Sequence, residues 1–161
     1  MFPSPEENRR RIEVAVRTAR HADIIVLALG ENELLCQESF APTFPGDHAS
    51  LGLWSQQNEL FEALNRLGKP VVVCLMHGRP LDIASIADKA DAVLDLWYAG
   101  QETGNALADV LFGDVNPSGK LTVTYPRSSA HLPVNYNLKP TTASRDYIGE
   151  KYDASILSDM D

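Results

Sequence analysis

Polar and aromatic side chains follow three apolar stretches of the chain, at the point where each stretch ends. Glu31 follows the first stretch, Arg79 closes the triplet 77–79 after the second, and residues 97–102 follow the third. Arg and carboxylate side chains hydrogen-bond hydroxyl groups, and aromatic rings stack on the flat faces of ligands. The combination predicts a site for a polar, uncharged ligand, but it does not identify that ligand.

A long segment without clear periodicity, residues 31–54, begins at the first of these strand ends. A loop of this length inside a small domain is usually either functional or disordered. The loop combines carboxylates, a histidine and aromatic rings: Glu31, Glu33, Glu38, Asp47, His48, Phe40, Phe44 and Trp54. This chemistry favours a functional loop, and we expect residues that contact the ligand within it.

The residues at the strand ends also have purely structural interpretations. Arg79 could pair with a carboxylate of the long loop and hold it in place instead of binding a ligand. Trp97 and Tyr98 could form the edge of the core or an interface, and Glu102 could stabilise the first turn of a helix. The sequence leaves the role of His77 open.

Composition and missing motifs argue against several classes of function. A net charge of −8, from 22 acidic and 14 basic residues, disfavours nucleic acid as a partner. The chain has no Gly-x-Ser-x-Gly elbow, no glycine-rich phosphate loop after its first apolar stretch, and no zinc-site spacing. Its two cysteines, Cys36 and Cys74, form no disulfide framework. We therefore expect neither a metal nor a cofactor.

Membrane insertion has no support in the sequence either. No apolar run reaches the roughly 18 residues that a membrane-spanning helix requires. Residues 1–7 lack the basic and apolar pattern of a secretory signal. We predict no membrane partner, and the cellular compartment stays open.

Apolar periodicity alternates along the chain between helical and extended segments. The expected helices span 4–19, with Ser4 as N-cap, 55–68, with Ser55 as N-cap, 81–87 and 104–112; the expected strands span 24–29, 71–76, 92–96 and 121–125. Such alternation produces parallel strands with helical crossovers, and the first two strands are apolar enough to be covered on both faces. We predict an α/β fold: a three-layer, flavodoxin-like sandwich with a mostly parallel sheet and helices on both faces.

The most informative run is 97–121, in which an aromatic pair leads through a polar glycine turn and an apolar helix to an Asn-Pro-Ser-Gly turn. This run resembles the signature of the carboxyl-side α/β domain of family 3 glycoside hydrolases, the β-glucosidase and β-xylosidase group. Further matching blocks follow in the family's order: Gly30-Glu31-Asn32-Glu33, Gln37-Glu38-Ser39-Phe40, Gly46-Asp47-His48, His77-Gly78-Arg79-Pro80 and Tyr125-Pro126-Arg127-Ser128. The resemblance runs from about Ala22 to Tyr136. We predict the family domain over 1–143 and an extended or disordered tail over 144–161.

The resemblance also implies a mechanism. Family members are retaining enzymes with an aspartate nucleophile on a separate (β/α)8 barrel. In many members the acid/base glutamate lies seven residues after the Glu that follows the first strand. Counting from Glu31, this position is Glu38. The resemblance further places Phe40, Asp47, His48 and Arg79 among the residues that bind the substrate.

Two positions depart from the family pattern. His48 stands where members usually carry Arg, and an imidazole lacks the planar fork of a guanidinium group. His77 stands where members often carry Asn. Both substitutions bear on the sugar contacts and the loop geometry that the resemblance implies.

Our first functional hypothesis is a domain of a retaining, exo-acting β-glycosidase, either a β-xylosidase or a β-glucosidase. Its substrate would be a β-linked oligosaccharide or an aryl glycoside. Its partner would be the barrel, without which the chain is expected to be inactive and to self-associate through an exposed apolar patch. The alternative is a stand-alone carbohydrate-binding or interaction module without catalysis. A flavodoxin-like cofactor domain rests on architecture alone.

Overall fold

A parallel sheet of three strands forms the centre of the protein, whose computed structural model describes residues 3–32, 35 and 50–134. The strands are β1 (Ile25–Gly30), β2 (Val71–Met76) and β3 (Ala92–Asp95), in the order β1-β2-β3. Leu27 lies opposite Val73, which in turn lies opposite Val93. The parallel α/β architecture expected from the sequence is therefore confirmed.

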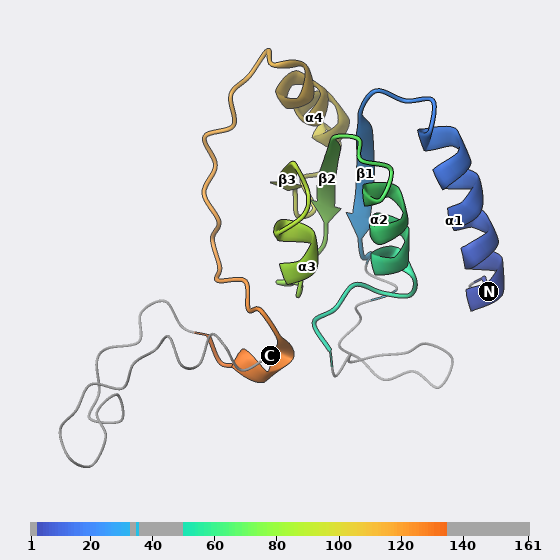
Figure 1. Ribbon diagram of the computed structural model, residues 1–161. Helices are drawn as coiled ribbons and strands as arrows, with labels where there is room; N and C mark the ends of the chain where they lie inside the picture. Colours follow the sequence, from blue (N-terminus) through green and yellow to red (C-terminus); the bar gives the residue numbers. More distant parts are fainter. Residues whose placement is uncertain (1–2, 33–34, 36–49, 135–161) are drawn as a thin grey trace, which may run out of the picture.

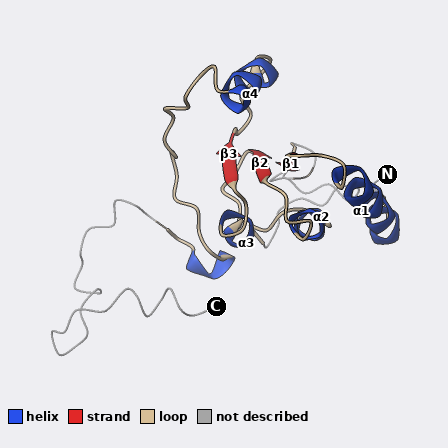
Figure 2. Ribbon diagram, turned by 45° about the horizontal axis from the view of Figure 1, so that its top comes forward, coloured by secondary structure: helices blue, strands red, loops and turns tan. Residues whose placement is uncertain are grey.

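Helices lie on both sides of this sheet (Figure 2). The helices α1 (Pro5–Ala19), α2 (Gln57–Asn65) and α3 (Ala84–Ala87) occupy one side, and α4 (Thr103–Phe112) occupies the other. The crossovers through α2 and α3 both step along the sheet in the same direction, and right-handed crossovers of this kind place their helices on the same face. Figure 1 shows the resulting arrangement, with α4 near the amino-terminal ends of the strands.

The core lies between the sheet and the side that carries α1, α2 and α3. Strand side chains of alternating position enter it, together with apolar residues of the helices and their connections. Its members are Ile25, Leu27, Leu29, Val71, Val73, Leu75, Leu53, Phe61, Leu64, Leu81, Ile86 and Ala19. Phe61, Val73 and Leu75 are fully buried, so this layer accounts for most of the apolar burial that stabilises the fold.

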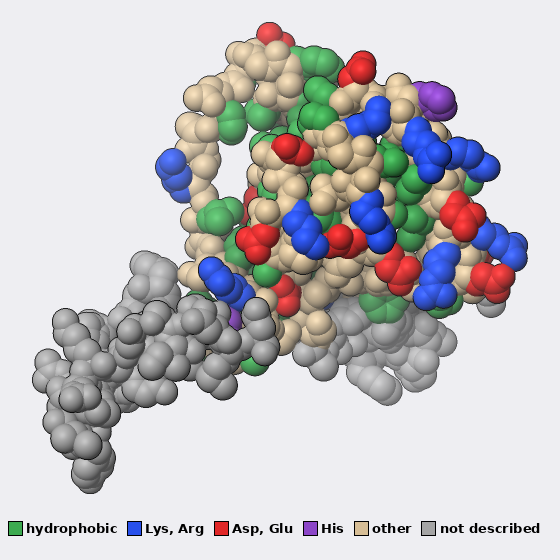
Figure 3. All heavy atoms as spheres, in the orientation of Figure 1, with side chains coloured by type: hydrophobic (Ala, Val, Ile, Leu, Met, Phe, Trp, Pro, Cys, Tyr) green, Lys and Arg blue, Asp and Glu red, His purple; other side chains and the backbone are tan. Residues whose placement is uncertain are grey.

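The start of α1 follows the sequence prediction. Ser4 accepts a hydrogen bond from the backbone N–H of Glu7 at 3.2 Å, and Pro5 occupies the first turn. Arg10 pairs with Glu6 and Arg11 pairs with Glu7, each one turn apart. Figure 3 shows acidic and basic side chains interspersed over this face. The basic triplet is thus part of a solvated helix surface.

The predicted start of the second helix is wrong. Ser55 has a left-handed φ of 58° and does not cap the helix, which begins at Gln57. The Ser55 hydroxyl instead donates to Gln56 Oε1 and accepts from Asn8 Nδ2. The Ser55 hydroxyl, which the local pattern predicts to cap α2, therefore bonds Asn8 of α1 instead. The next helix is also shorter than predicted, since only Ala84–Ala87 are helical.

Burial on both faces is confirmed for β2 but not for β1. Cys74 is 1% exposed, whereas Val26 is 52% exposed and Ile24 is 57% exposed. Burial along β1 alternates, because its inward residues face the helical core while its other face has no comparable cover among the described residues. The sequence of β1 is therefore typical of a strand buried on both faces, although the described residues bury only one of them.

The fourth strand predicted over 121–125 does not form. Leu121 and Val123 are 64% and 38% exposed, and the segment has no strand hydrogen bonds. A cavity of about 440 Å³, lined by residues of β3, α4 and 117–122, lies where a neighbouring strand would close against β3. Tyr125 is the residue that reaches the sheet, through its side chain. The period-two pattern is present in the sequence, but no strand within residues 3–32 and 50–134 pairs with this segment.

None of the helices in the described ranges has the length and apolarity needed to cross a membrane.

Gly30 gives the first prediction, since it ends β1 with a φ of 138° and a Cβ built there would lie 1.8 Å from the Met76 carbonyl oxygen. Gly30→Ala should lower the free energy of unfolding by about 3 kcal/mol, because strain adds to a backbone clash. The matched control is Gly104→Ala in α4, where the added Cβ meets nothing within 4 Å. It should raise stability by about 0.5–1 kcal/mol. Urea unfolding of both variants measures the difference, and equal stabilities would contradict this close approach of β1 and β2.

Candidate functional site

The carboxyl ends of β1 and β2 meet at one edge of the sheet. Gly30 lies opposite Met76, and the backbone N–H of Glu31 donates to the Met76 carbonyl at 2.8 Å. This bond extends the pairing by one residue and sets the direction in which Glu31 leaves the strand. The residues that follow each strand therefore enter the same small region.

Glu31 and Arg79 form a bidentate ion pair at this edge. Arg79 Nε donates to Glu31 Oε2 at 2.9 Å, and Nη2 donates to Oε1 at 2.8 Å. The Glu31 side chain is 1% exposed and that of Arg79 is 22% exposed. A buried carboxylate requires such partners, and the planar fork of Arg satisfies both oxygens at once.

Arg79 also reaches the other end of the long loop. Its Nη1 donates to the Ser50 carbonyl at 3.1 Å. The next residue, Leu51, donates its N–H to Ser129 Oγ and accepts from the N–H of Asp82. One guanidinium group thus binds Glu31, the first residue of the loop, and Ser50, the residue that follows the undescribed residues 36–49.

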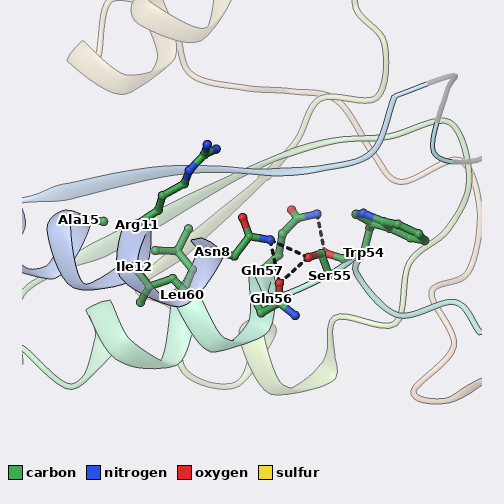
Figure 4. A pocket seen from close by; sticks show the side chains of 9 residues that line it. All are labelled: Asn8, Arg11, Ile12, Ala15, Trp54, Ser55, Gln56, Gln57 and Leu60. Carbon is green, nitrogen blue, oxygen red and sulfur yellow. Dashed lines mark hydrogen bonds between the residues drawn. The ribbon is translucent and has the colours of Figure 1, made fainter. Parts of the chain in front are cut away.

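Gln57 fixes the end of β1 through its side-chain amide. Its side-chain oxygen accepts from the Gly30 N–H at 2.7 Å, and its Nε2 donates to the Gly30 carbonyl at 2.8 Å. Nε2 also donates to the Trp54 carbonyl. The Gln57 amide therefore bonds the N–H and the carbonyl of Gly30, as a neighbouring strand would, and holds the backbone next to Glu31. Gln57 also borders a cavity of about 360 Å³ between α1 and α2 (Figure 4).

Tyr98 lies over the turn that follows β2. Its hydroxyl donates to the Glu31 carbonyl at 3.3 Å, and its ring packs against Gly78, where a Cβ would lie 2.7 Å from Cε2. Only glycine allows this approach without a shift. Tyr98 thereby connects the segment after β3 to the ion pair between the first two strand ends.

A second polar cluster contains His77, Asp95, Trp97 and Tyr125. His77 is fully buried, and its Nε2 lies 2.6 Å from Asp95 Oδ1. Asp95 Oδ2 accepts from the Tyr125 hydroxyl at 2.7 Å and from Trp97 Nε1 at 3.1 Å. Burial, followed by the hydrogen bond to Asp95 and its negative charge, raises the pKa of Tyr125 well above its ordinary value.

Sequence reasoning missed Asp95 and Tyr125 as site-forming residues. Asp95 ends an apolar strand, and an acidic residue at the carboxyl end of such a strand is a signal that could have selected it. Tyr125 gave no local signal, because its partner lies 30 residues away. His77, whose role was open, and Trp97 belong to this cluster.

Some of the predicted site residues lie within the described part of the chain and the others lie outside it. The structure brings Glu31, Arg79 and Tyr98 together, but Glu38, Phe40, Asp47 and His48 lie outside the described residues. Glu102 is exposed and accepts from Asn105 Nδ2 at the start of α4. Within the described ranges, no three His, Cys, Asp or Glu side chains gather as ligands for a metal.

The Glu31–Arg79 pair gives the second prediction. Glu31→Gln should cost about 3 kcal/mol of stability, because it leaves the guanidinium group without its charged partner. Arg79→Lys should cost less, since the ammonium group keeps the charge but loses the fork. A double-mutant cycle should give a coupling energy above about 1 kcal/mol.

The exposed pair Arg10–Glu6 is the matched control, with side chains 75% and 79% exposed. The cycle of Glu6→Gln and Arg10→Lys should yield about 0.5 kcal/mol or less. Chemical denaturation measures both cycles. Equal coupling in the two pairs would contradict the special strength assigned to Glu31 and Arg79.

Comparisons with known proteins extend the resemblance read from the motifs. The model of the glycosyl hydrolase family 3 C-terminal domain matches residues 6–157. A β-xylosidase of Formosa agariphila is 43% identical over 135 residues, which are 84% of this chain and 17% of that protein. A periplasmic β-glucosidase of Salmonella typhimurium is 42% identical over 147 residues, which are 91% of this chain and 18% of that protein.

Solved structures give the same result. A β-glucosidase of Erythrobacter marinus superposes with a TM-score of 0.82 at 44% identity, covering 94% of this chain and 22% of that one. A β-glucosidase of Listeria innocua in complex with glucose gives a TM-score of 0.69 at 36% identity, covering 86% and 18%. The chain spans about a fifth of the length of these relatives. It belongs to glycosyl hydrolase family 3, as part of that family's C-terminal α/β domain.

Proposed function

We propose that this chain is the domain of a retaining, exo-acting β-glycosidase that supplies the general acid/base Glu38. The nucleophile would come from a (β/α)8 barrel, and the substrate would be a β-linked glucoside or xyloside. The names of the relatives support the class of activity, since they are β-glucosidases and β-xylosidases. The observation that carries the proposal is the attachment of both described ends of the Glu38 loop to Arg79.

This attachment suits a loop that must deliver a catalytic group across a domain junction. Glu31 is held by Arg79, by the Met76 carbonyl and by Tyr98, and Ser50 is held by the same Arg79. Fixing both ends reduces the number of conformations open to the residues between them. A proton donor requires placement within hydrogen-bond reach of the leaving oxygen, so such restriction favours catalysis.

The proposed chemistry proceeds in two displacements. The barrel aspartate attacks the anomeric carbon while the Glu38 carboxyl group gives its proton to the departing glycosidic oxygen. The resulting Glu38 carboxylate then takes a proton from water as that water displaces the aspartate. The two carboxyl groups lie about 5 Å apart in retaining enzymes. We expect Phe40, two positions after Glu38, to favour the protonated form of Glu38 that the first step requires.

The substrate contacts belong to the same proposal. Asp47 and His48 would hydrogen-bond sugar hydroxyl groups, and Phe40 would pack against the sugar ring. Arg79 would contact the substrate while it holds Glu31, so its contribution to the site is both electrostatic and positional. An Arg79→Lys variant that bound substrate as before would restrict this residue to the positional role.

The third prediction tests Glu38 in a chimera. This chain would replace the segment that it matches in the Salmonella β-glucosidase, so that the relative's remaining residues supply the barrel. Hydrolysis of aryl and alkyl β-glucosides and β-xylosides would then be measured for Glu38 and Glu38→Gln. The variant should lose about 10²–10⁴-fold in kcat on alkyl glycosides, whose poor leaving groups need the proton. The loss on nitrophenyl glycosides should be smaller.

Glu13→Gln, on the exposed face of α1, is the control for removal of one carboxylate and should leave kcat unchanged. Full turnover of alkyl glycosides by the Glu38→Gln chimera would contradict the acid/base assignment. Binding of glucose or xylose by the chain alone, together with an inactive chimera, would favour the carbohydrate-binding module instead. Calorimetry on the isolated chain provides that measurement.

The fourth prediction concerns Ile24, Val26 and Met76, which have little cover among the described residues. The register places Val26 and Met76 on one face, because Val26 lies opposite Val72 and Gly30 opposite Met76, and Ile24 precedes Val26 by two positions. All three are exposed by 38% or more. We propose that another part of the complete enzyme covers this face and that the isolated chain self-associates through it.

Sedimentation velocity at increasing concentration should therefore show dimers or larger species. Val26→Lys should restore a monomer, because it places a charge in the centre of the apolar face. Val14→Lys on α1, where the native side chain is 50% exposed, should leave the association unchanged. A monomer at all concentrations would contradict the proposal.

A further inference from the structure

The cluster of His77, Asp95, Trp97 and Tyr125 joins three separate segments at one carboxylate. His77 follows β2, Trp97 follows β3, and Tyr125 comes from the segment that fails to form a fourth strand. The Asp95 side chain is 14% exposed, so its oxygens depend on protein donors more than on water. Removing this carboxylate would affect all three segments at once.

The hydrogen bonds of the cluster determine where its protons lie. The single Tyr125 hydroxyl proton and the Trp97 Nε1–H both point to Asp95 Oδ2. An ionised carboxylate only accepts, so His77 Nε2 must carry a hydrogen toward Oδ1. The Tyr125 oxygen, 3.0 Å from the same Nε2, is then free to accept from it as well. Three donors thus satisfy one carboxylate.

His77 Nδ1 supports the same arrangement. It is buried and has no hydrogen-bond partner among the described residues. A proton on Nδ1 would be an unsatisfied buried donor, which costs more than an unsatisfied lone pair on a ring that already donates through Nε2. The geometry therefore selects the His77 tautomer that carries its hydrogen on Nε2, which nitrogen NMR observes directly.

Two of the three donors stand next to residues of the candidate site. His77 is two positions before Arg79, and Gly78 between them supports the Tyr98 ring. Trp97 directly precedes Tyr98 and has a left-handed φ of 50°, which is unusual for an aromatic residue. A strained residue persists only where its surroundings hold it, and here the Nε1–H···Oδ2 bond and the His77 ring, 4.8 Å away, hold Trp97.

We propose that Asp95 is the positioning residue of the candidate site: by holding His77 and Trp97, it sets the two turns that bring Arg79 and Tyr98 to Glu31. Its relevance to catalysis rests on the proposed function, whereas the positioning itself is a property of this chain. Tyr125 completes the carboxylate's hydrogen bonds and attaches the segment after α4 to the same point.

The test compares Asp95→Asn with Asp114→Asn in the full 161-residue chain labelled with ¹⁵N. Asp114 is exposed, so its variant controls for the loss of one charge. The amide introduced by Asp95→Asn must turn N–H groups toward at least one of the native donors. In the native chain, nitrogen NMR should show His77 as the Nε2–H tautomer, and the Arg79 Nε–H should exchange slowly with water.

In Asp95→Asn, exchange of the Arg79 Nε–H should become at least about tenfold faster. The His77 signals should also leave the Nε2–H pattern. The exposed Arg10 and the backbone amides of β1 serve as internal references for folding. Native exchange at Arg79 in a folded Asp95→Asn chain would overturn the proposal, because Asp95 would then only pack locally.

Tyr125→Phe keeps the test decisive if Asp95→Asn fails to fold. It removes one donor and leaves the bonds of His77 and Trp97 in place. The Arg79 exchange should then rise above its rate in the native chain by less than about tenfold, and the His77 tautomer should stay unchanged. A changed tautomer in Tyr125→Phe would contradict the assignment of the Nε2 proton to Asp95.

Alkaline titration supplies an independent readout of the cluster. The raised pKa of Tyr125 means that the folded chain keeps this proton while the unfolded chain loses it near the ordinary value of 10.0. The stability that Tyr125 contributes is therefore complete below about pH 10 and decreases as the pH rises above it. Tyr125→Phe should flatten this decrease, measured by urea unfolding. Asp114→Asn should leave it intact.

The chimera separates this proposal from the proposed function. An inactive chimera with native Arg79 exchange in the chain would count against the function and not against the positioning role. An active chimera in which Asp95→Asn keeps both kcat and KM would contradict positioning, even if Glu38→Gln is inactive. Under the proposal, Asp95→Asn should lower kcat more than it raises KM, because a misplaced loop affects the transition state most.

Discussion

The bidentate ion pair between Glu31 and Arg79 is the interaction on which the rest of the site depends. It exists because β1 and β2 are paired up to their last residues, so that Glu31 leaves one strand end where the turn with Arg79 leaves the next. Its burial makes it sensitive to geometry, since a carboxylate away from water gains little unless both oxygens are bonded. Gln57 and Tyr98 fix the backbone on either side of it.

A hierarchy of supports surrounds this pair. The fully buried layer of Phe61, Val73 and Leu75 fixes the sheet, the sheet fixes the strand ends, and the Asp95 cluster fixes the turns after them. The layer that fixes the sheet is apolar, whereas the strand ends and the Asp95 cluster that depend on it are polar. The family relationship is consistent with this order, because a shared fold needs only its edge loops changed to change what it binds.

The sequence predicted those features that depend on neighbouring residues. The cap of α1 by Ser4 and the doubly buried strand β2 required only local patterns. The meeting of Glu31 and Arg79 followed from the rule that parallel strand ends share an edge. Ser55 escaped prediction because its partner, Asn8, lies 47 residues away.

The same limit applies to the other differences. The alternation at 121–125 is a sound local signal for a strand, yet the backbone beside β3 does not meet it, and Tyr125 bonds instead through its side chain to Asp95, 30 residues away. Val26 is apolar, as in a strand that is covered on both faces, yet its side chain is exposed. Whether a strand is covered depends on distant residues and cannot be predicted from the strand's own sequence. The differences between prediction and structure therefore arise from contacts between residues far apart in the sequence more than from local secondary-structure propensity.

The sequential strand order has a consequence for how this chain folds. The contact of Val71 with Asp91 closes 20 residues, whereas that of Glu31 with Arg79 closes 48. Loop-closure entropy makes the second closure costlier by about 0.8 kcal/mol. Loop closure alone therefore favours pairing of β2 with β3 over pairing of β1 with β2. The Glu31–Arg79 ion pair depends on the pairing with the larger closure cost, so the site is the part of the sheet whose assembly carries the greater entropic penalty.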